Sequence, residues 1–457
     1  MISEHFDERM KRLLGDEYPE FEAALEKSAV RALRINPIKY SGDIESDLGI
    51  PLRPIPYGKG GFILPEGSEG IGNSPLHHGG AFYVQDPGAM ATAEACDEEG
   101  DLLVCDLCAA PGGKSTQVAA RLGEGGFLLS NEYVPKRAKI LVGNIERLGI
   151  KNAIVTSMDT GDIAGLFDSV FDLVIADAPC SGEGMFRKGD TAREMWSEEN
   201  VTLSAKRQSY ILDNAARITK DGGRIIYSTC TYSTEENEEM IDSFLSRHPE
   251  FSLVPVTERV ARATSDGVTP EGSLREDLHL TRRFYPHKSE GEGQFIAVLK
   301  KNNSGNMPRF LYKDSLKSPP RDQLAIINKF FEDNLISRPD GRVGLYNSNL
   351  VLIPGDFPLP PSSVFSAGVL IGEIRSGILF PSHQFFSAYG HLFKRTEELS
   401  TPERARKYLL GEELEAKDLM NGSGYCAISY GGVILGGGKV SQGRIKNHYP
   451  KGLRLKK

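Results

Sequence analysis

Residues 102–116, LLVCDLCAAPGGKST, constrain the fold more than any other stretch of the chain. An apolar run ends at a Pro-Gly-Gly break and an amphipathic stretch follows from Lys114, which predicts a strand, a tight turn and a helix. Glycine has no Cβ atom, so a ligand can closely approach the backbone of Gly112 and Gly113. The N–H groups that begin the helix can receive an anionic or polar ligand.

Several functions use a turn of this kind. A P-loop is excluded, because the glycine that it requires five residues before the Gly-Lys pair is Cys108 here. The dinucleotide pattern GxGxxG is also absent. Two interpretations remain open at this point. The turn either holds a nucleoside-type cofactor such as S-adenosylmethionine, or it connects a strand to a helix and binds nothing.

Strand and helix patterns alternate from residue 82 to residue 300. FYVQDPGAM, from Phe82, opens a predicted helical stretch that runs to Ala95, and Ser233 with Glu236 predicts a capping box for a later helix. Strands are predicted at 102–107, 127–130, 153–157, 171–176, 224–228 and 295–299. This alternation predicts an α/β domain with a doubly wound parallel sheet of the Rossmann type.

Polar residues follow the predicted strands, and ligands of such sheets bind at the carboxyl ends of the strands. Glu132 can accept hydrogen bonds from ribose hydroxyls, and Asp159 can accept one from an adenine amino group. Each of these acids can equally be a helix N-cap or a surface acid. Together with the glycine turn they predict a nucleoside pocket.

Two cysteines occupy polar loops at the same predicted edge, Cys180 in Pro-Cys-Ser-Gly and Cys230 in Thr-Cys-Thr. A thiolate there can add to carbon 6 of a pyrimidine, which gives carbon 5 carbanion character and splits one difficult step into easier ones. No metal site is expected, because the CxxC at Cys105 and Cys108 has no second pair. These two cysteines, with Cys96 and Cys426, are expected to be packing residues.

The 457 residues are enough for several domains, and the composition is that of a globular protein. We expect an N-terminal α/β unit (1–80), a catalytic domain (81–300), a polar linker (301–320) and a C-terminal α+β region (321–457). The first residues lack the apolar run of a signal peptide and no stretch has the length of a membrane span, so a cytoplasmic location is expected.

Charge is unevenly distributed along the chain. The net charge is −8, but residues 301–457 hold 22 Lys+Arg and only 14 Asp+Glu. From Gly431 to the last residue there are seven basic residues and no acid. A basic, aromatic-containing end suits RNA phosphates, although charge alone equally fits a solvated terminus. The candidate RNA-binding residues are Lys439, Arg444, Lys446, Lys451 and Arg454.

Taken together, these segments resemble the RNA cytosine-5 methyltransferases of the Sun (Fmu) family. CAAPGGKS is similar to the cofactor turn of that family, and DAPCSGEG and STCTYSTEENE are similar to its two cysteine motifs. FYVQDPGAM and RRFYPHKSEGEGQF resemble its flanking segments. GMFRK and the C-terminal KVSQGRIKNHYPKGLRL resemble the RsmF branch, which acts on small-subunit ribosomal RNA and ends in a PUA-like RNA-binding domain.

The resemblance implies a role for each motif residue. Cys230 would be the nucleophile, Cys180 would assist release of the methylated base, and Asp177 would contact the cytosine ring. S-adenosylmethionine would be the cofactor. Its pocket would include Ala109, Ala110, Pro111, Gly112, Gly113, Lys114, Ser115, Glu132, Arg137, Asp159 and Asp177.

The same resemblance implies the partner. The substrate would be RNA, small-subunit ribosomal RNA or a subunit particle, with the target base unpaired or flipped out, and the protein would act as a monomer. Two other classes of function stay open: a methyltransferase of small molecules, which the paired cysteine turns and the basic end disfavour, and an RNA-binding assembly factor without chemistry, which the intact motifs disfavour.

Overall fold

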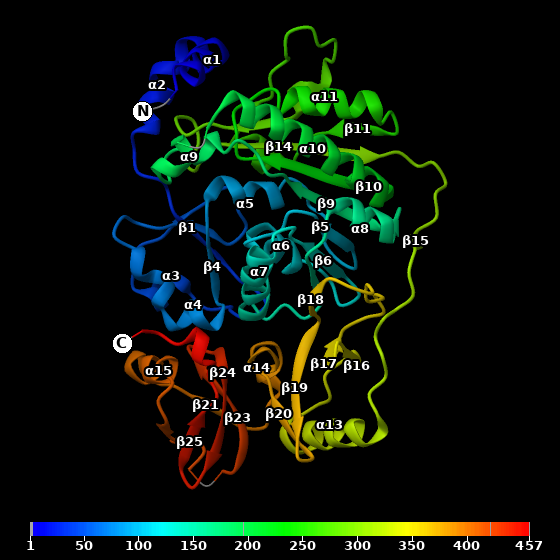
Figure 1. The fold of residues 1–457 in the computed structure, drawn as a ribbon. Helices are drawn as coiled ribbons and strands as arrows, with labels where there is room; N and C mark the ends of the chain where they lie inside the picture. The colour runs from blue at the N-terminus through cyan, green and yellow to red at the C-terminus, as the bar shows by residue number, and fades with distance from the viewer. Residues whose placement is uncertain (1–2, 195, 421, 457) are drawn as a thin grey trace.

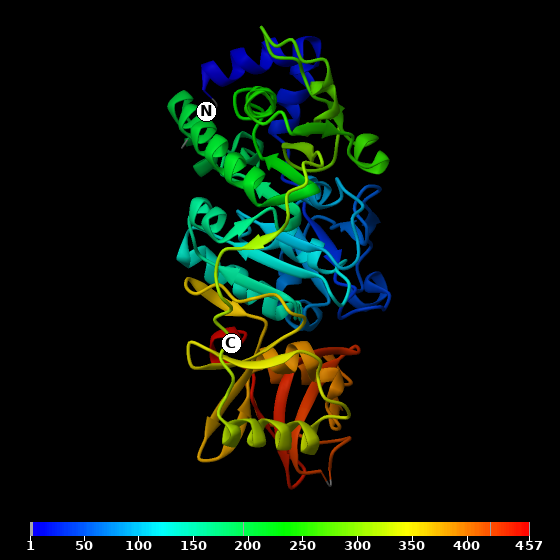
Figure 2. The same ribbon diagram turned by 90° about the vertical axis from the view of Figure 1, so that its right-hand side faces the viewer.

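The computed structural model describes residues 3–194, 196–420 and 422–456. The C-terminal part lies below a large central sheet, and the N-terminal helices lie above it (Figure 1). Figure 2 shows the same order in profile. None of the described helices combines the length and the apolar character needed to cross a membrane.

Five parallel strands form the centre of a ten-stranded sheet. They lie in the order β7-β6-β5-β9-β10, and each neighbouring pair is parallel. All five coincide with apolar runs of the sequence, which confirms the predicted Rossmann-like domain. The strands are β5 (Leu103–Asp106), β6 (Phe127–Asn131), β7 (Ala153–Thr156), β9 (Phe171–Asp177) and β10 (Thr219–Thr229).

The sheet is mixed, because antiparallel strands flank the five parallel strands of the predicted doubly wound sheet. β14 (Gln294–Lys301) runs antiparallel to β10, and β18 (Val364–Ala367) runs antiparallel to β7. β14 pairs antiparallel with β13 (Arg282–Phe284), the strand that precedes it in the chain, and no helix lies between the two. A parallel pair would need a crossover connection there. β18 comes from the C-terminal region, so no local pattern in the catalytic segment reveals it.

Helices cover both faces of this sheet. α6 (Gly113–Ala119) and α7 (Pro135–Arg147) contribute to one apolar layer, in which Leu141 and Ile145 of α7 are buried. The other layer contains side chains of α8 (Thr160–Leu166), α10 (Glu198–Ile218) and α11 (Glu238–Arg247). The carboxyl ends of the parallel strands therefore form an open edge between two helical layers.

The stretch from residue 82 to 95 is not helical throughout, contrary to the prediction. Residues 82–85 form β4 (Phe82–Gln85), which pairs with β1 (Ala32–Ile35), and α5 is confined to Pro87–Ala93. Asp86 sets this limit, because its side chain accepts a hydrogen bond from the Ala89 N–H and caps the helix. The N-terminal sheet, β2-β3-β1-β4, therefore extends past residue 80, where a boundary was expected. Its other strands are β2 (Arg53–Pro54) and β3 (Gly61–Ile63).

The first two helices do not pack on that N-terminal sheet. α1 (Glu4–Leu14) and α2 (Tyr18–Leu25) lie against the loops that follow β9 and β10. The ring of Phe6 lies 5.1 Å from that of Phe186, and the ring of Phe21 lies 5.1 Å from that of Tyr232. The N-terminus thus supports the loops that carry the two candidate catalytic cysteines.

The segment 301–320, expected to be a linker, runs along the central domain (Figure 1). Its strand β15 (Arg309–Phe310) pairs with β8 (Phe167–Asp168). Farther along, Phe357 stacks on Phe127 of β6 with ring centroids 4.5 Å apart. The apolar core of the central domain thus includes side chains up to Ala367.

The remaining C-terminal part is an α+β region with a β-rich end, as the sequence predicts. α13 (Arg321–Asn334), α14 (His383–Tyr389) and α15 (Pro402–Leu409) accompany two antiparallel-rich sheets. The first sheet is β16 (Arg342–Tyr346), β17 (Asn349–Ile353), β19 (Val369–Arg375) and β20 (Ile378–Pro381). The second is β21 (Thr396–Glu398), β23 (Gly424–Tyr430), β24 (Val433–Ser441), β25 (Arg444–Asn447) and β22 (Leu414–Glu415).

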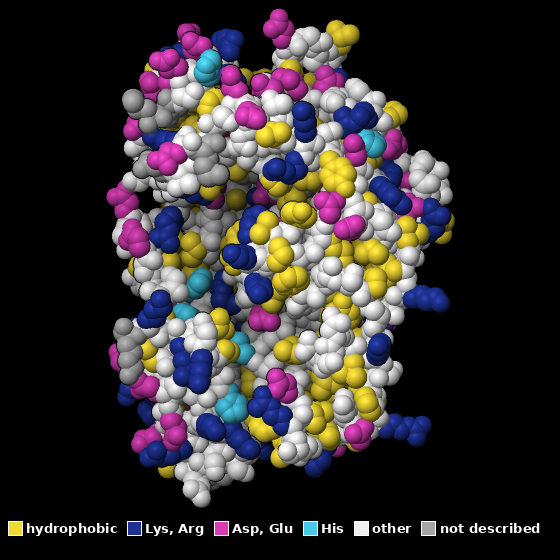
Figure 3. All heavy atoms as spheres, viewed as in Figure 1, with side chains coloured by type: hydrophobic (Ala, Val, Ile, Leu, Met, Phe, Trp, Pro, Cys, Tyr) yellow, Lys and Arg dark blue, Asp and Glu magenta, His cyan; other side chains and the backbone are white. Residues whose placement is uncertain are grey.

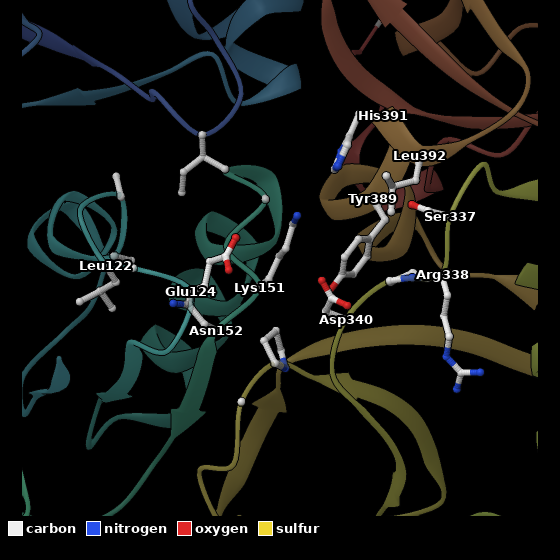
Figure 4. A pocket seen from close by; sticks show the side chains of 18 residues that line it. Leu122, Glu124, Lys151, Asn152, Ser337, Arg338, Asp340, Tyr389, His391 and Leu392 are labelled. Carbon is white, nitrogen blue, oxygen red and sulfur yellow. The ribbon is translucent and has the colours of Figure 1, made fainter. Parts of the chain in front are cut away.

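A cavity of about 600 Å³ lies where the central domain meets the C-terminal part (Figure 4). Lys151 and Tyr389 face each other in it, with the lysine Nζ 4.7 Å from the ring centroid. Asn152, at its wall, directly precedes β7. The cavity is therefore at the amino ends of the strands, on the opposite edge of the sheet from the glycine turn and the cysteines.

Candidate active site

The glycine turn joins β5 to α6 at the open edge of the sheet. Gly112 has a φ of +111°, and a Cβ atom there would lie 2.9 Å from Leu141 Cδ1. A side chain is therefore strained by the backbone conformation and would require Leu141 to shift. Backbone groups of the turn are tied to the next strand and helix, because Ala109 N–H donates to Asn131 O and Arg137 donates to Ala110 O, each at 2.8 Å.

A buried acid that the sequence reasoning did not single out supports the turn from below. Asp106, the last residue of β5, is 1 % exposed and accepts a 2.6 Å hydrogen bond from Ser115 Oγ. It also accepts one from the Cys108 N–H. Burial raises the pKa of the Asp106 carboxyl to about 7, against the effect of the Ser115 hydrogen bond. Its position at a strand end, beside the predicted turn, was the available signal.

Glu132 lies at the end of β6, as predicted. Its side chain is 4 % exposed, Oε1 accepts from the Val134 N–H at 2.9 Å, and Oε2 lies 3.1 Å from Arg137. A carboxylate oxygen has more than one lone pair, so each oxygen keeps an acceptor position for a ribose hydroxyl. This donor and acceptor set fits the nucleoside end of S-adenosylmethionine.

Asp159 is the N-cap of α8, which was one of the two interpretations of this acid. Its Oδ1 accepts from the Gly161 N–H at 2.8 Å and from the Tyr210 hydroxyl at 2.7 Å. Its Oδ2 accepts no hydrogen bond from a described residue, so one oxygen stays available for a ligand. Capping a helix and binding a ligand are thus compatible at this position.

The structure brings the two loop cysteines together. Cys180 follows β9 and Cys230 follows β10, and their sulfur atoms are 3.1 Å apart. The Cys230 N–H also donates to Cys180 Sγ at 3.3 Å. The hydrogen bond with Cys230, and then burial, raise the pKa of the Cys180 thiol well above its ordinary value. The raised pKa favours the protonated form of Cys180.

Asp177 links the cysteines to the glycine turn. Its Oδ2 lies 2.7 Å from Lys114 Nζ, and its Oδ1 accepts a 2.6 Å hydrogen bond from Ser228 Oγ. Burial alone would lower the pKa of Lys114, but the Asp177 carboxylate and the nearby Cys230 raise it above its ordinary value. The lysine therefore keeps its positive charge beside Cys230.

Two buried acids hold the cysteine loops in place. Glu236 Oε2 accepts from the Ser181 N–H at 3.0 Å and from Gln208 at 2.7 Å. Glu183 is fully buried and accepts from the Tyr232 N–H at 3.0 Å and from Trp196 Nε1 at 2.7 Å.

Only one half of the predicted capping box forms. The Glu236 N–H donates to Ser233 Oγ at 3.3 Å, but the Glu236 carboxylate faces the Cys180 loop, and α11 begins two residues later, at Glu238. Arg9 of α1 pairs with Glu183, which connects the N-terminal helix to the loops.

The basic C-terminal residues lie on and after the last strands, far from the cysteines along the chain. Lys439, Lys446 and Lys451 are exposed, and Lys439 lies over the Tyr425 ring at 5.4 Å. Arg444 is also exposed but pairs with Glu413. Arg454 is only partly exposed and donates to the Tyr449 carbonyl, so it acts in part as a structural residue.

Comparison with known proteins finds similarity along almost the whole chain. A family model described as 16S rRNA methyltransferase RsmB/F matches residues 93–300. The N-terminal domain of 16S rRNA methyltransferase RsmF matches residues 2–87, and the methyltransferase RsmF PUA domain matches residues 398–455. Ribosomal RNA small subunit methyltransferase F of Vibrio vulnificus is 31% identical, covering 99% of this chain and 97% of the relative. The chain belongs to the RsmF family.

Other relatives and solved structures agree. The methyltransferase F of Erwinia tasmaniensis is 31% identical, covering 98% of this chain and 96% of the relative. The crystal structure of a methyltransferase homolog protein from Pyrococcus horikoshii is 27% identical, with a TM-score of 0.57, and covers 65% of this chain and 95% of that one. As a member of the RsmF family, the protein is a methyltransferase whose cofactor is S-adenosylmethionine, and the glycine turn with Glu132 and Asp159 is the part of the chain that fits it.

Proposed function

We propose that the protein methylates carbon 5 of a cytosine in small-subunit ribosomal RNA through a covalent bond between Cys230 and the pyrimidine. The observation that carries the proposal is the pair of sulfur atoms 3.1 Å apart beside the cofactor turn. The names of the relatives support the substrate, and the PUA domain supports RNA binding. We also propose that the protein acts in the cytoplasm as a monomer.

Cys230 is the nucleophile in this proposal. Its thiolate adds to carbon 6 of cytosine, and carbon 5 then becomes nucleophilic. The cofactor, when bound, supplies an electrophilic methyl group. Lys114, 2.7 Å from Asp177, contributes positive charge near Cys230. The proton released by the Cys230 thiol passes to N3 of the ring, and the Asp177 carboxylate accepts a hydrogen bond from that N3–H.

Cys180 acts in the release step. Its thiol stays protonated before attack, because the pKa is raised, so it does not compete with Cys230 as nucleophile. After methyl transfer a solvent water takes the carbon 5 proton and the bond from Cys230 to carbon 6 breaks, and the Cys180 thiol stabilises the departing Cys230 thiolate by donating a hydrogen bond to it. The target base must be unpaired or flipped out, because the thiolate attacks the face of the ring.

The test is methyl transfer from labelled cofactor to small-subunit ribosomal RNA, followed by digestion to nucleosides. The expected product is 5-methylcytidine. Label on another nucleoside would contradict the cytosine assignment, and label on small molecules alone would favour a methyltransferase of small molecules. RNA binding without any transfer would favour an assembly factor.

The two cysteine variants test the mechanism. Cys230→Ala is expected to give neither product nor adduct. Cys180→Ala is expected to attack and methylate, and then to remain as a protein–RNA adduct that survives denaturing electrophoresis. An adduct in the Cys230 variant alone would reverse the roles, and full activity of both variants would contradict covalent catalysis.

A further inference from the structure

Exposed side chains beside the active site form a surface for which the mechanism gives no role. Residues 133–137, Tyr-Val-Pro-Lys-Arg, are all exposed at the exit of β6. On α10, the side chains at 203, 206, 207 and 210 are exposed and follow the i, i+3, i+4, i+7 spacing of one helix face. We call these two groups the α7–α10 surface: Tyr133, Val134, Lys136, Lys139, Ile140, Leu203, Lys206, Arg207 and Tyr210.

The two groups meet at the loop that follows β7. Ser157 Oγ in this loop donates to the Tyr133 carbonyl at 3.2 Å. Two residues later, Asp159 accepts the hydrogen bond from the Tyr210 hydroxyl. The Tyr133 carbonyl and the Tyr210 hydroxyl are therefore both tied to one short loop, and neither hydrogen bond uses a ring face. Tyr133 is 68% exposed and Tyr210 is 48% exposed. The rings are free to contact a partner.

The surface also reaches the catalytic loops. Gln208, on the buried side of α10, donates to the carbonyl of Pro179, next to Cys180, at 3.0 Å. Arg207, its neighbour in sequence, belongs to the exposed face. One turn of the same helix thus contacts the Cys180 loop on one side and solvent on the other.

Charge and exposure indicate what binds here. Among the described residues, none of Lys136, Lys139, Lys206 and Arg207 forms an ion pair. Of the sixteen large hydrophobic side chains that are exposed among the described residues, five belong to this surface. Figure 3 shows basic and hydrophobic side chains side by side over α7 and α10. Unpaired cations interleaved with exposed aromatic rings suit a single-stranded nucleic acid, whose phosphates pair with the cations and whose bases stack on the rings.

We propose that the α7–α10 surface binds a single-stranded segment of the RNA substrate next to the target cytosine, with Lys206 and Arg207 on phosphates and the rings of Tyr133 and Tyr210 stacked on bases. This inference rests on the proposed function for the identity of the RNA, but its test measures binding and not methylation. Asp162, an exposed acid near Tyr210, marks one end of the surface. Because this carboxylate repels phosphates, the RNA segment would leave the surface before that residue.

The charge test compares two double variants by fluorescence anisotropy with a labelled single-stranded RNA oligonucleotide over a range of salt concentrations. Lys206→Glu with Arg207→Glu is expected to weaken binding at least about ten-fold and to reduce the slope of log K against log salt by about 1.4, for two lost contacts to single-stranded phosphates. Lys313→Glu with Lys329→Glu, two exposed lysines outside the surface, makes the same change in net charge and is the control. Equal binding and equal slopes for the two double variants would overturn the inference.

The stacking test uses Tyr210. Tyr210→Ala is expected to weaken RNA binding about five-fold or more, the effect of losing one base–aromatic stack. Tyr210→Phe keeps the ring, loses the hydrogen bond to Asp159, and is expected to bind RNA as the unchanged protein does. Equal losses in both variants would show that the hydroxyl, and not the ring, matters, which contradicts stacking.

Two further measurements separate this inference from other outcomes. Calorimetry with S-adenosylmethionine is expected to give unchanged affinity for the Lys206 and Arg207 double variant, which shows that the pocket is intact. Normal binding to free RNA but weak binding to a small-subunit particle would identify a protein partner and overturn the inference. Absence of 5-methylcytidine with intact, surface-dependent RNA binding would contradict only the proposed function.

Discussion

Cys180 and Cys230 are the same residue type in different surroundings, and the difference supports the proposed order of action. Both follow a strand of the central sheet, and the two sulfurs share one hydrogen bond. Cys180 is held as a thiol, whereas Cys230 lies within the field of Lys114. A pair of equivalent thiols would offer two competing nucleophiles. In the proposed mechanism, the asymmetric pair offers one nucleophile and keeps the other sulfur as a hydrogen-bond donor for the release step.

Asp106 leads to a prediction about pH. The pKa of its carboxyl is about 7 in the folded protein, against an ordinary value of 3.8, so the folded state binds this proton more tightly than the unfolded state. The contribution of Asp106 to stability therefore falls as the pH rises from about 4 to about 7. Asp106→Asn removes this penalty. Relative to the unchanged protein, the variant should gain about 3 kcal/mol in unfolding free energy between pH 5 and pH 8, because one pKa unit corresponds to 1.36 kcal/mol.

Urea unfolding without cofactor at the two pH values measures this difference. Asp101→Asn, at an exposed acid, controls for the loss of one negative charge. A gain for Asp106→Asn that does not change with pH would show that burial does not raise the pKa of this carboxyl.

At the scale of elements, the candidate active site consists of two loops. They are held by two buried acids that have no direct part in the proposed chemistry. Glu236, in the loop after β10, accepts a hydrogen bond from the backbone of the loop after β9. Glu183, in the loop after β9, accepts one from the backbone of the loop after β10. Each loop therefore helps to fix the other. α1 and α2 then cover both with aromatic side chains. The spacing of the sulfurs depends on this mutual support.

Glu236→Ala tests the support. The variant loses two hydrogen bonds to a buried carboxylate, each worth about 1.5–3 kcal/mol, and leaves the Ser181 N–H without a partner. We expect methyl transfer to RNA to slow about ten-fold or more while the affinity for S-adenosylmethionine stays unchanged. Glu239→Ala, at an exposed acid of the same segment, is the control. Equal rates for the two variants in a single-turnover assay would show that Glu236 does not position the loops.

The sequence predicts those parts of the site that depend on local pattern. Apolar runs place the five strands, and polar residues at or shortly after the carboxyl ends of these strands are then expected at the open edge, which predicts the positions of Glu132, Asp159 and Asp177. Glu236 was misassigned, because a Ser-x-x-Glu spacing is also typical of a capping box, and only the position of Ser181 shows where its carboxylate points. β18 was missed for a similar reason, because its partner β7 lies about 200 residues earlier.

At the scale of the molecule, the central domain is completed by the C-terminal region. Phe357 is 5% exposed and stacks on Phe127, and Ile353, Leu359 and Ala367 lie in the same apolar core. The family models leave residues 301–397 unmatched, between the catalytic and PUA segments. This unmatched stretch therefore includes side chains of the catalytic core.

Phe357→Ala should destabilise the central domain by about 3–5 kcal/mol, the usual effect of removing a buried phenylalanine. Trp196 is the only tryptophan and lies beside Glu183 in the central domain, so its fluorescence reports unfolding of this domain in urea. Phe365→Ala, at a ring that is 39% exposed, should have a much smaller effect. An unchanged transition for Phe357→Ala would show that the central domain is stable without the later segment.

The late position of β18 also matters while the chain is being made. β7 leaves the ribosome about 200 residues before its antiparallel partner. At synthesis rates of about 5–20 residues per second, the N–H and C=O groups along this edge of β7 stay unpaired on the nascent chain for about 10–40 s. An open strand edge is a template for pairing with other chains. The interval before residue 367 emerges is therefore the period in which the nascent protein most needs protection from aggregation.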